Sequence, residues 1–277
     1  MIDYPEEYTD GYVMFMGRRF TTDPRALIPR LETEELVNYC MRLLSEHPHI
    51  QTVADIGTGS GIIPISLLSK ADRPLTVFAT DMSQEALELA QENAQKNSDK
   101  APLSRGVARS AGGFNEFENP PIDKRGTKGE FVWNISRINP PPSHSSGTSF
   151  KKEVTGGITF LHWDLLEPLI RHFWNSVPEA LLITANLPYV REKEINSWLI
   201  HEPRMAFLGG VQTGFELYER FFEQLLAWNN RPRQCYVVIE FWLWQRDIAE
   251  TVFQKHGFEY TFFPDLRGIE RFACVVV

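Results

Sequence analysis

A glycine-rich turn between an apolar strand and a helix most constrains what this chain can fold into. The apolar run Thr52–Ile56 has the length of a strand, and Gly-Thr-Gly-Ser-Gly follows it at residues 57–61. The segment 62–70 then continues as a helix, with Pro64 in the first turn, where a missing backbone N–H costs little. A strand, a glycine turn and a helix in this order open a parallel α/β unit.

Strand-length apolar runs alternate with helical patterns over most of the chain. Beyond Thr52–Ile56, strands are predicted at 75–81, 157–164, 180–186, 234–240, 258–266 and 271–277. Helices are predicted at 31–47, 62–70 and 84–97, the last capped by Ser83, and from near Leu165, Phe215 and Trp244. Near-continuous apolar strands alternating with helices predict a parallel sheet covered on both faces, and the last two strands form an antiparallel pair.

Two stretches stand apart from this alternation. Residues 11–23 alternate in polarity and turn at Gly17, which predicts a β-hairpin, so we divide the chain into an N-terminal segment over 1–30 and a main domain over 31–277. Residues 98–157 contain six Pro, eight Gly and eight Ser. Because such a composition buries little apolar surface, it predicts an irregular, disordered insertion with one short strand at 130–138.

Composition excludes several classes of protein. No apolar run approaches the roughly 18–20 residues that span a bilayer, and the acidic N-terminus is no secretory signal. The three cysteines, Cys40, Cys235 and Cys274, give neither a disulfide framework nor a zinc spacing, which favours a cytoplasmic protein without a metal. A net charge of −8 argues mildly against a protein that grips a long nucleic acid.

The glycine turn and two strand-end carboxylates are expected to bind a nucleoside. The spacing Gly57-x-Gly59-x-Gly61 is not that of a pyrophosphate site, and no Lys-Ser/Thr follows, which excludes a P-loop. Asp81 ends the second strand, where a carboxylate can accept two hydrogen bonds from a ribose diol, and Asp164 ends the third, beside an adenine edge. The alternative is a tight turn with two capping residues.

The motif Asn186-Leu187-Pro188-Tyr189 ends the fourth strand of the predicted sheet. The Asn186 side-chain oxygen and the Leu187 carbonyl are acceptors that can hold both N–H groups of a planar amide or amine. Pro188 restrains Leu187 to an extended conformation, and Tyr189 offers a ring to stack on a flat substrate group. The motif is therefore a candidate for binding an acceptor nitrogen.

Two similar stretches lack this context. Asn119 and Asn139 are each followed by Pro-Pro, but both lie within the predicted insertion, and neither follows an apolar strand or precedes a Tyr. We therefore assign the chemistry to Asn186 alone.

Seven segments occur in the order found in one known family: LIPRLETEELV, VADIGTGSGIIPISLL, ATDMSQEALELAQENAQKN, HWDLLEPL, ANLPYV, EPRMAFLGG and VVIE. The chain resembles the HemK/PrmC family, S-adenosylmethionine-dependent methyltransferases that act on the side-chain amide nitrogen of a protein glutamine. The resemblance covers roughly residues 11–97 and 158–277. It implies a Rossmann-like class I methyltransferase fold, with a seven-stranded, mostly parallel sheet that ends in an antiparallel pair and is preceded by the hairpin.

The resemblance also implies a role for each matching residue. Gly57 to Gly61 would line the methionine part of S-adenosylmethionine, Asp81 would bind its ribose, and Asp164 with Leu165 its adenine. The residues expected to bind the cofactor are Asp55, Gly57, Thr58, Gly59, Ser60, Gly61, Asp81, Met82, Asp164 and Leu165. Those expected to hold the substrate amide are Asn186, Leu187, Pro188 and Tyr189, with Pro29, Arg30, Glu32 and Thr33 closing the cleft.

The implied substrate is the Gly-Gly-Gln motif of a peptide-chain release factor, which acts in translation termination. No metal or catalytic acid is needed, and His162 is interpreted as a strand residue. The family usually has Pro at the position of Leu187 and a glycine after the position of Glu240, where this chain has Phe241-Trp242. It also usually carries an N-terminal helical domain, which this chain is expected to lack. Either another surface, such as the insertion, or a small partner protein would then dock the substrate, or the target differs.

Two alternatives remain open. An adenine-N6 methyltransferase acting on RNA or DNA would use Asn-Leu-Pro-Tyr in the same way, and the acidic composition and the IPRLETE segment (28–34) argue against it. An inactive, cofactor-binding scaffold would use the insertion as an interaction arm.

Overall fold

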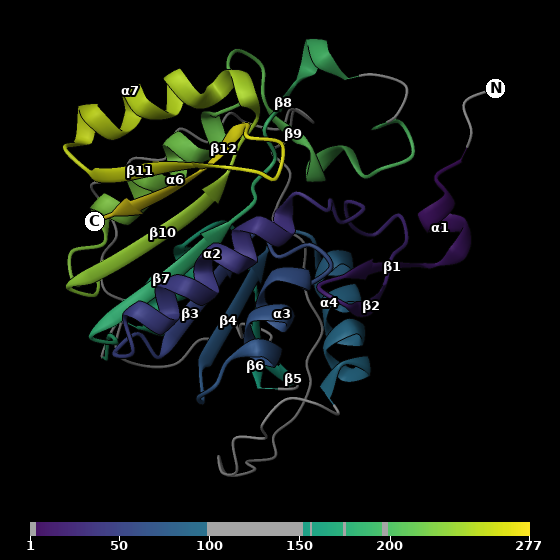
Figure 1. Cartoon of the computed structure of the whole chain (residues 1–277), viewed down its shortest axis with the longest axis horizontal. Coiled ribbons are helices and arrows are strands. Elements are labelled where there is room, and N and C mark those ends of the chain that lie inside the picture. The colour runs from purple at the N-terminus through teal and green to yellow at the C-terminus, as the bar shows by residue number, and fades with distance from the viewer. Residues whose placement is uncertain (1–3, 99–151, 156, 174–175, 196–198) are drawn as a thin grey trace, which may run out of the picture. The chain divides into compact units, whose positions relative to one another are not determined.

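The computed structural model describes residues 4–98, 152–155, 157–173, 176–195 and 199–277. Within these residues, the seven predicted strands form one sheet, which confirms the predicted α/β class (Figure 1). They are β3 (Thr52–Ile56), β4 (Thr76–Asp81), β6 (Ile158–His162), β7 (Ala180–Ala185), β10 (Gln234–Glu240), β11 (Glu259–Pro264) and β12 (Glu270–Val276). Five are parallel, and β12 pairs antiparallel with both β10 and β11.

The structure adds an eighth strand to this sheet. β5 (Lys152–Thr155) pairs antiparallel with β6, which gives the order β11-β12-β10-β7-β3-β4-β6-β5. This strand lies inside the range 98–157, which the sequence predicted to be irregular. The prediction was therefore wrong for residues 152–155, which form regular structure. The predicted strand at 130–138 and the two look-alike residues Asn119 and Asn139 lie outside the described residues.

Helices cover both faces of the sheet, as the apolar strands predicted. One core packs α2 (Thr33–Glu46), α3 (Ile62–Lys70) and α4 (Gln84–Lys96) on one face. The other packs α5 (Glu167–His172), α6 (Glu216–Ala227) and α7 (Arg246–His256). Successive residues of β3 serve the two cores, since Val53 belongs to the first and Ala54 to the second. All five side chains of β3 are buried, which explains why the strand is continuously apolar apart from Asp55.

The predicted hairpin is present and follows a short helix, α1 (Glu6–Asp10). Its strands are β1 (Tyr12–Phe15) and β2 (Arg18–Thr21). Met16 and Gly17 both have positive φ angles, of 51° and 75°, as a two-residue turn matching the twist of the strands requires. Asn93, buried on α4, attaches the hairpin to the domain: its side chain bonds both the N–H and the carbonyl of Thr21, and also the carbonyl of Ser60 in the glycine turn.

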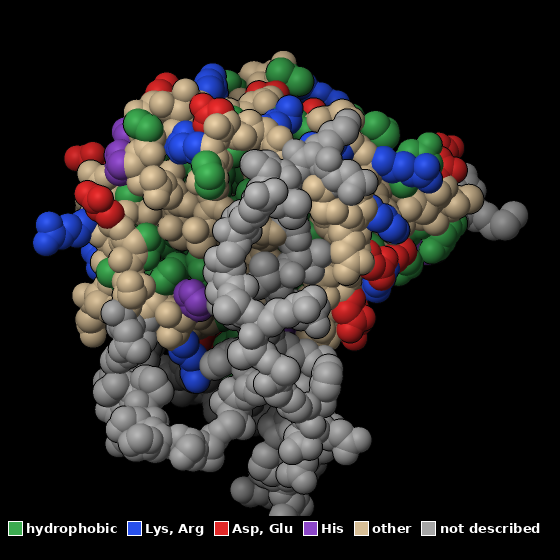
Figure 2. Space-filling view, turned by 90° about the horizontal axis from the view of Figure 1, so that it is seen from below, with side chains coloured by type: hydrophobic (Ala, Val, Ile, Leu, Met, Phe, Trp, Pro, Cys, Tyr) green, Lys and Arg blue, Asp and Glu red, His purple; other side chains and the backbone are tan. Residues whose placement is uncertain are grey.

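Smaller elements complete the fold. β8 (Val190–Arg191) and β9 (Leu208–Gly210) form a two-stranded parallel sheet, and 3₁₀ turns span Glu192–Glu194, Arg204–Ala206 and Leu243–Gln245. The predicted cap of α4 is confirmed, because the Ser83 hydroxyl accepts the N–H of Ala86 at 3.1 Å. Among the described residues, no helix has the length and apolarity to cross a membrane. On the described part of the face in Figure 2, charged side chains of both signs are interspersed.

Candidate functional site

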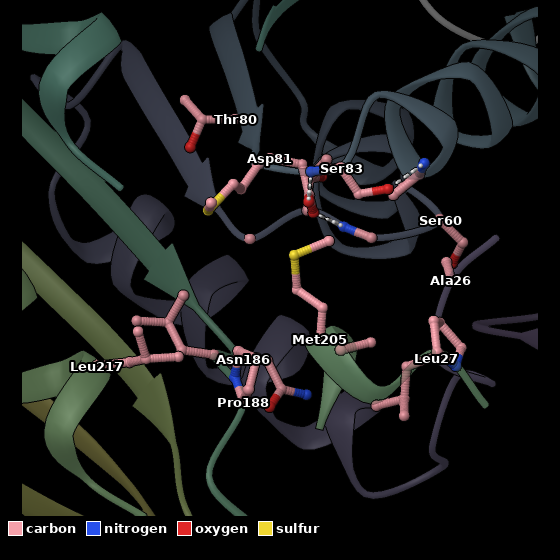
Figure 3. Close-up of a pocket in the computed structure, with 18 of the residues that line it drawn as sticks. Ala26, Leu27, Ser60, Thr80, Asp81, Ser83, Asn186, Pro188, Met205 and Leu217 are labelled. Atoms are coloured by element: carbon pink, nitrogen blue, oxygen red, sulfur yellow. Dashed lines mark hydrogen bonds between the residues drawn. The ribbon is translucent and has the colours of Figure 1, made fainter. Parts of the chain in front are cut away.

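A cavity of about 610 Å³ opens at the carboxyl ends of the parallel strands, within the size range of small-molecule sites (Figure 3). Most of the predicted site residues line it: Pro29, Arg30, Thr33, Gly57, Thr58, Gly59, Ser60, Asp81, Met82, Asp164, Leu165, Asn186, Leu187 and Pro188. In Figure 3, Asp81 and Asn186 lie on opposite sides of the cavity, and Met205 reaches into the space between them. Glu32, Asp55, Gly61 and Tyr189 do not belong to the lining.

The glycine turn, residues 57–61, is fixed by hydrogen bonds to the end of β4. The N–H groups of Gly57 and Thr58 both donate to the carbonyl of Thr80, each at 2.9 Å. Gly57 has a φ angle of 71°, and a Cβ built on it would lie 2.9 Å from Cδ2 of Leu187. A larger residue at Gly57 would therefore be both strained and crowded, so glycine lets the backbone itself form the wall of the cavity.

Asp81 ends β4 and anchors the turn from the neighbouring strand. One carboxylate oxygen accepts the N–H of Gly59, and the other accepts the N–H of Ser83, both at 2.8 Å. Burial raises the pKa of Asp81, while these two backbone donors favour its ionised form. Each oxygen retains a lone pair after these bonds, so the carboxylate can still accept two hydrogen bonds from a diol, as predicted for ribose.

Asp164 and Leu165 follow β6 at the same edge. Arg220 from α6 donates to Oδ1 of Asp164 at 2.6 Å, whereas burial raises the pKa of this carboxyl. Leu165 has a φ angle of 46°, which is uncommon for a branched residue, and its carbonyl accepts the Thr80 hydroxyl at 3.2 Å. Arg220 was missed from the sequence, because it lies 56 residues beyond Asp164.

Asp55 lies beneath the glycine turn and does not line the cavity. Its side chain is fully buried, and Oδ1 accepts the hydroxyl of Thr184 on β7 at 2.6 Å. Burial raises the pKa of this carboxyl to about 6. Asp55 therefore ties β3 to β7 below the turn, so its predicted contact with the cofactor stays a prediction.

The opposite end of the cavity is organised by Glu240, at the end of β10. Its Oε2 accepts the Thr33 hydroxyl at 2.8 Å and the side-chain N–H of Asn186 at 3.1 Å. The Thr33 oxygen lies 3.3 Å from the same amide nitrogen, so Thr33 and Glu240 together face the nitrogen side of the Asn186 amide. An amide held by its nitrogen keeps its carbonyl oxygen as an acceptor for another group.

Glu240 is only 1% exposed, and this burial raises the pKa of its carboxyl to about 7. The Thr33 hydroxyl and the positive charge of Arg271 oppose the rise. The sequence analysis noted Glu240 only as a strand end and did not assign it to the site. The sequence does contain a feature that could have identified Glu240: it is an acidic residue at the end of an apolar strand, and that strand pairs with the one that ends at Asn186. The same feature identified Asp81.

Tyr189 lies beside Glu240 and Trp242. Its ring is outside the lining of the cavity, 6.1 Å from the ring of Trp242, and its hydroxyl lies 3.4 Å from Oε1 of Glu240. The side-chain amide of Gln245 donates to the backbone carbonyl of Tyr189 at 3.0 Å. In this arrangement Tyr189 supports Glu240, and its predicted stacking on a flat substrate group stays a prediction.

The segment that contains Pro29 and Arg30 is fixed by Glu202, a residue missed from the sequence. The buried Glu202 carboxylate accepts the backbone N–H of Ile28 at 2.8 Å and pairs with the guanidinium of Arg30. This pair joins the IPRLETE segment to the segment EPRMAFLGG, some 170 residues later. Glu32 stands at the start of α2 and points no group into the cavity lining.

Comparisons with known proteins agree with this geometry. A family model described as "Methyltransferase small domain" matches residues 36–137. The release factor glutamine methyltransferase of Bacillus anthracis is 29% identical over 91% of this chain and 68% of its own length. The enzyme of the same name from Bacillus subtilis is 26% identical over 99% of this chain and 75% of its own length. The chain is therefore similar to release factor glutamine methyltransferases over most of its length.

A solved structure supports the fold. The human methyltransferase 10 domain containing protein has a TM-score of 0.52 and 15% identity, and the match covers 94% of this chain and 88% of that one. The family model and these relatives identify the chain as an S-adenosylmethionine-dependent methyltransferase. The residues present fit this cofactor, because each oxygen of Asp81 keeps a free lone pair after its backbone bond and the glycines of the turn leave part of the cavity wall without side chains.

Proposed function

We propose that this chain methylates the side-chain amide nitrogen of a protein glutamine, in the Gly-Gly-Gln motif of a peptide-chain release factor. The observation that carries the proposal is the orientation of Asn186. Because Glu240 and Thr33 hold the nitrogen side of its amide, its oxygen is left to accept an N–H from a planar acceptor in the cavity. The names of the relatives, release factor glutamine methyltransferases, supply the class of acceptor.

The residues of the chain would act by orienting the acceptor. The glycine turn and Asp81 would hold S-adenosylmethionine, which would supply an electrophilic methyl group. As the new C–N bond forms, the bond between that methyl group and sulfur would break to leave S-adenosylhomocysteine, and the amide nitrogen would release one proton to water. The Asn186 oxygen and the Leu187 carbonyl would each accept one N–H of the glutamine amide, which directs its nitrogen lone pair toward that methyl group. Two accepted hydrogen bonds also push electron density onto a nitrogen that is otherwise a poor nucleophile.

Adenine is the second candidate acceptor, since its amino group is planar and carries two N–H groups. The charge of the chain disfavours a nucleic acid, because the net charge is −8 and both signs are interspersed on the described surface in Figure 2. A small partner protein that helps to dock the release factor also belongs to this proposal.

The test is to incubate the whole chain with S-adenosylmethionine carrying a labelled methyl group and with one acceptor at a time. The acceptors are a release factor, the same factor with the glutamine of Gly-Gly-Gln changed to glutamate, and an adenine-containing RNA. Label in the first alone is the expected result. Label in the RNA alone would establish the adenine alternative, and cofactor binding without label in any acceptor would establish an inactive scaffold.

A further inference from the structure

Tyr218, on α6, is fully buried behind the Asn-Leu-Pro-Tyr motif and has no role in the family resemblance described above. Its hydroxyl accepts the backbone N–H of Leu187 at 2.9 Å. The same oxygen lies 3.1 Å from the carbonyl of Ala185 and in close contact with the carbonyl of Glu240, so its single proton can be donated to either. One side chain therefore bonds the ends of β7 and β10, which carry Asn186 and Glu240.

The bond to Leu187 matters because of what this chain has at that position. The family usually has Pro there, and Pro has no N–H. Leu187 introduces a donor that is buried, since the residue is 3% exposed and its side chain packs against Gly57. A buried N–H without a partner would cost free energy and would draw the peptide plane toward any other acceptor. The Tyr218 hydroxyl is the acceptor that the structure provides for it.

We propose that Tyr218 is a positioning residue for methyl transfer: by accepting the Leu187 N–H, it fixes the Asn186–Leu187 peptide and, through it, the Leu187 carbonyl. This inference rests on the proposed function, in which that carbonyl accepts one N–H of the substrate amide. Tyr218 lies outside the cavity lining and so acts only through the backbone of the motif.

A double-mutant cycle isolates this bond from the other contacts of the hydroxyl. Tyr218→Phe removes the acceptor, and Leu187→Pro removes the donor. Tyr218→Phe also removes the hydroxyl proton that is donated to the carbonyl of Ala185 or Glu240. This loss is the same with Leu187 and with Leu187→Pro, so it cancels when the two effects of Tyr218→Phe are compared. We expect Tyr218→Phe to lower kcat about tenfold in the natural chain, the typical effect of one hydrogen bond, and to lower it clearly less in the Leu187→Pro background. An equal factor in both backgrounds would overturn the proposal.

Two further readouts separate positioning from a general loss of structure. Cofactor affinity, measured by calorimetry, should stay within a few-fold in Tyr218→Phe, because the glycine turn and Asp81 do not touch Tyr218. Tyr236→Phe is the matched control, since it removes a half-buried tyrosine hydroxyl of β10 that lies 3.5 Å from His47, outside the cavity lining. It should leave kcat unchanged, and an equal loss in Tyr236→Phe would show that the effect is not specific to Tyr218.

Backbone hydrogen exchange distinguishes failure of this inference from failure of the proposed function. The Leu187 amide should exchange about tenfold faster in Tyr218→Phe, while the amide of Val190, which donates to the Phe207 carbonyl at 2.8 Å, keeps its rate. If the release factor receives no methyl group but the Leu187 amide loses protection, the proposed function fails and the contact of Tyr218 stands. An unchanged exchange rate at Leu187 would overturn the inference whatever the substrate.

Discussion

The two ends of the cavity are built in different ways. The end proposed to bind the cofactor consists largely of backbone: N–H groups of the glycine turn, with Asp81 bonded to two of the local N–H groups. The end proposed to hold the acceptor consists of side chains, in which Thr33, Asn186 and Tyr189 converge on one buried carboxylate, Glu240. The first end is local in the sequence, and the second joins segments separated by up to 207 residues.

This difference predicts that the two ends can be damaged independently. The cofactor end should control binding of S-adenosylmethionine, and the acceptor end should control the rate of transfer once both ligands are bound. The packing of Leu187 against Gly57 joins the two ends. The following predictions either separate the two ends or test that contact.

The largest effect is expected from Asn186→Ala. Loss of the oxygen that orients the acceptor should lower kcat by a factor on the order of 10³. Cofactor affinity should stay within a few-fold, because Asn186 donates only to Thr33 and Glu240. Single-turnover kinetics and calorimetry measure the two quantities, and near-normal turnover would remove Asn186 from the mechanism.

Asp81→Ala should produce the opposite pattern. The change removes the acceptors for the ribose and for the N–H groups of Gly59 and Ser83, so we expect the dissociation constant of the cofactor to rise by roughly 100-fold. At saturating cofactor, kcat should stay within a few-fold. A large fall in kcat at saturation would show that the two ends are not separable.

Gly57→Ala tests the contact between the ends. An added Cβ would lie 2.9 Å from Leu187 at a φ angle of 71°, so the variant should lose about 2 kcal/mol of unfolding free energy. Gly257→Ala is the matched control, with a φ angle of 68° but no atom within 4 Å of the added Cβ. Denaturant unfolding measures both, and equal losses would show that strain rather than crowding restricts Gly57.

Glu240 should make activity and stability respond oppositely to pH. Its pKa in the folded chain is about 7, above the ordinary value of 4.5, so the folded state binds more protons between these values. Its contribution to stability therefore falls as pH rises from about 4.5 to 7. Activity should rise over the same range, because the ionised carboxylate accepts the hydroxyls of Thr33 and Tyr189 and the Asn186 N–H more strongly than the neutral acid does.

Glu240→Gln should lower kcat about tenfold and remove this part of the pH dependence of both activity and stability, since a neutral amide does not titrate. Rate profiles and unfolding free energies between pH 5 and 8 provide the comparison. A glutamine variant that keeps the natural pH profile would assign the titration to another group.

The parts of the proposed cofactor end were visible in the sequence, because each of them belongs to one strand and the turn that follows it. The glycine spacing and the strand-end carboxylates Asp81 and Asp164 are visible within short windows. The strands were equally visible, because continuous apolar runs are typical of a sheet buried on both faces. β5 was not, since a short edge strand in a Pro/Gly/Ser-rich range is fixed by its pairing with β6 and not by a pattern of its own.

Only some residues of the proposed acceptor end could be predicted from the sequence. The sequence identified Asn186 and Thr33, but not Glu240, Glu202 or Tyr218, whose partners are set by how α6, β10 and the segment around Glu202 pack. The position of Tyr189 shows the same limit. A four-residue motif fixes the order of groups along the chain, but the rotation of each side chain depends on distant neighbours.

Tandem mass spectrometry of a release factor, after incubation with this chain and S-adenosylmethionine, tests the central claim most directly. The account predicts fragment ions that place one methyl group on the side chain of the glutamine in Gly-Gly-Gln, and no such ions with Asn186→Ala. A methyl group on any other residue of the factor, or an unmethylated glutamine with an active enzyme, would contradict it.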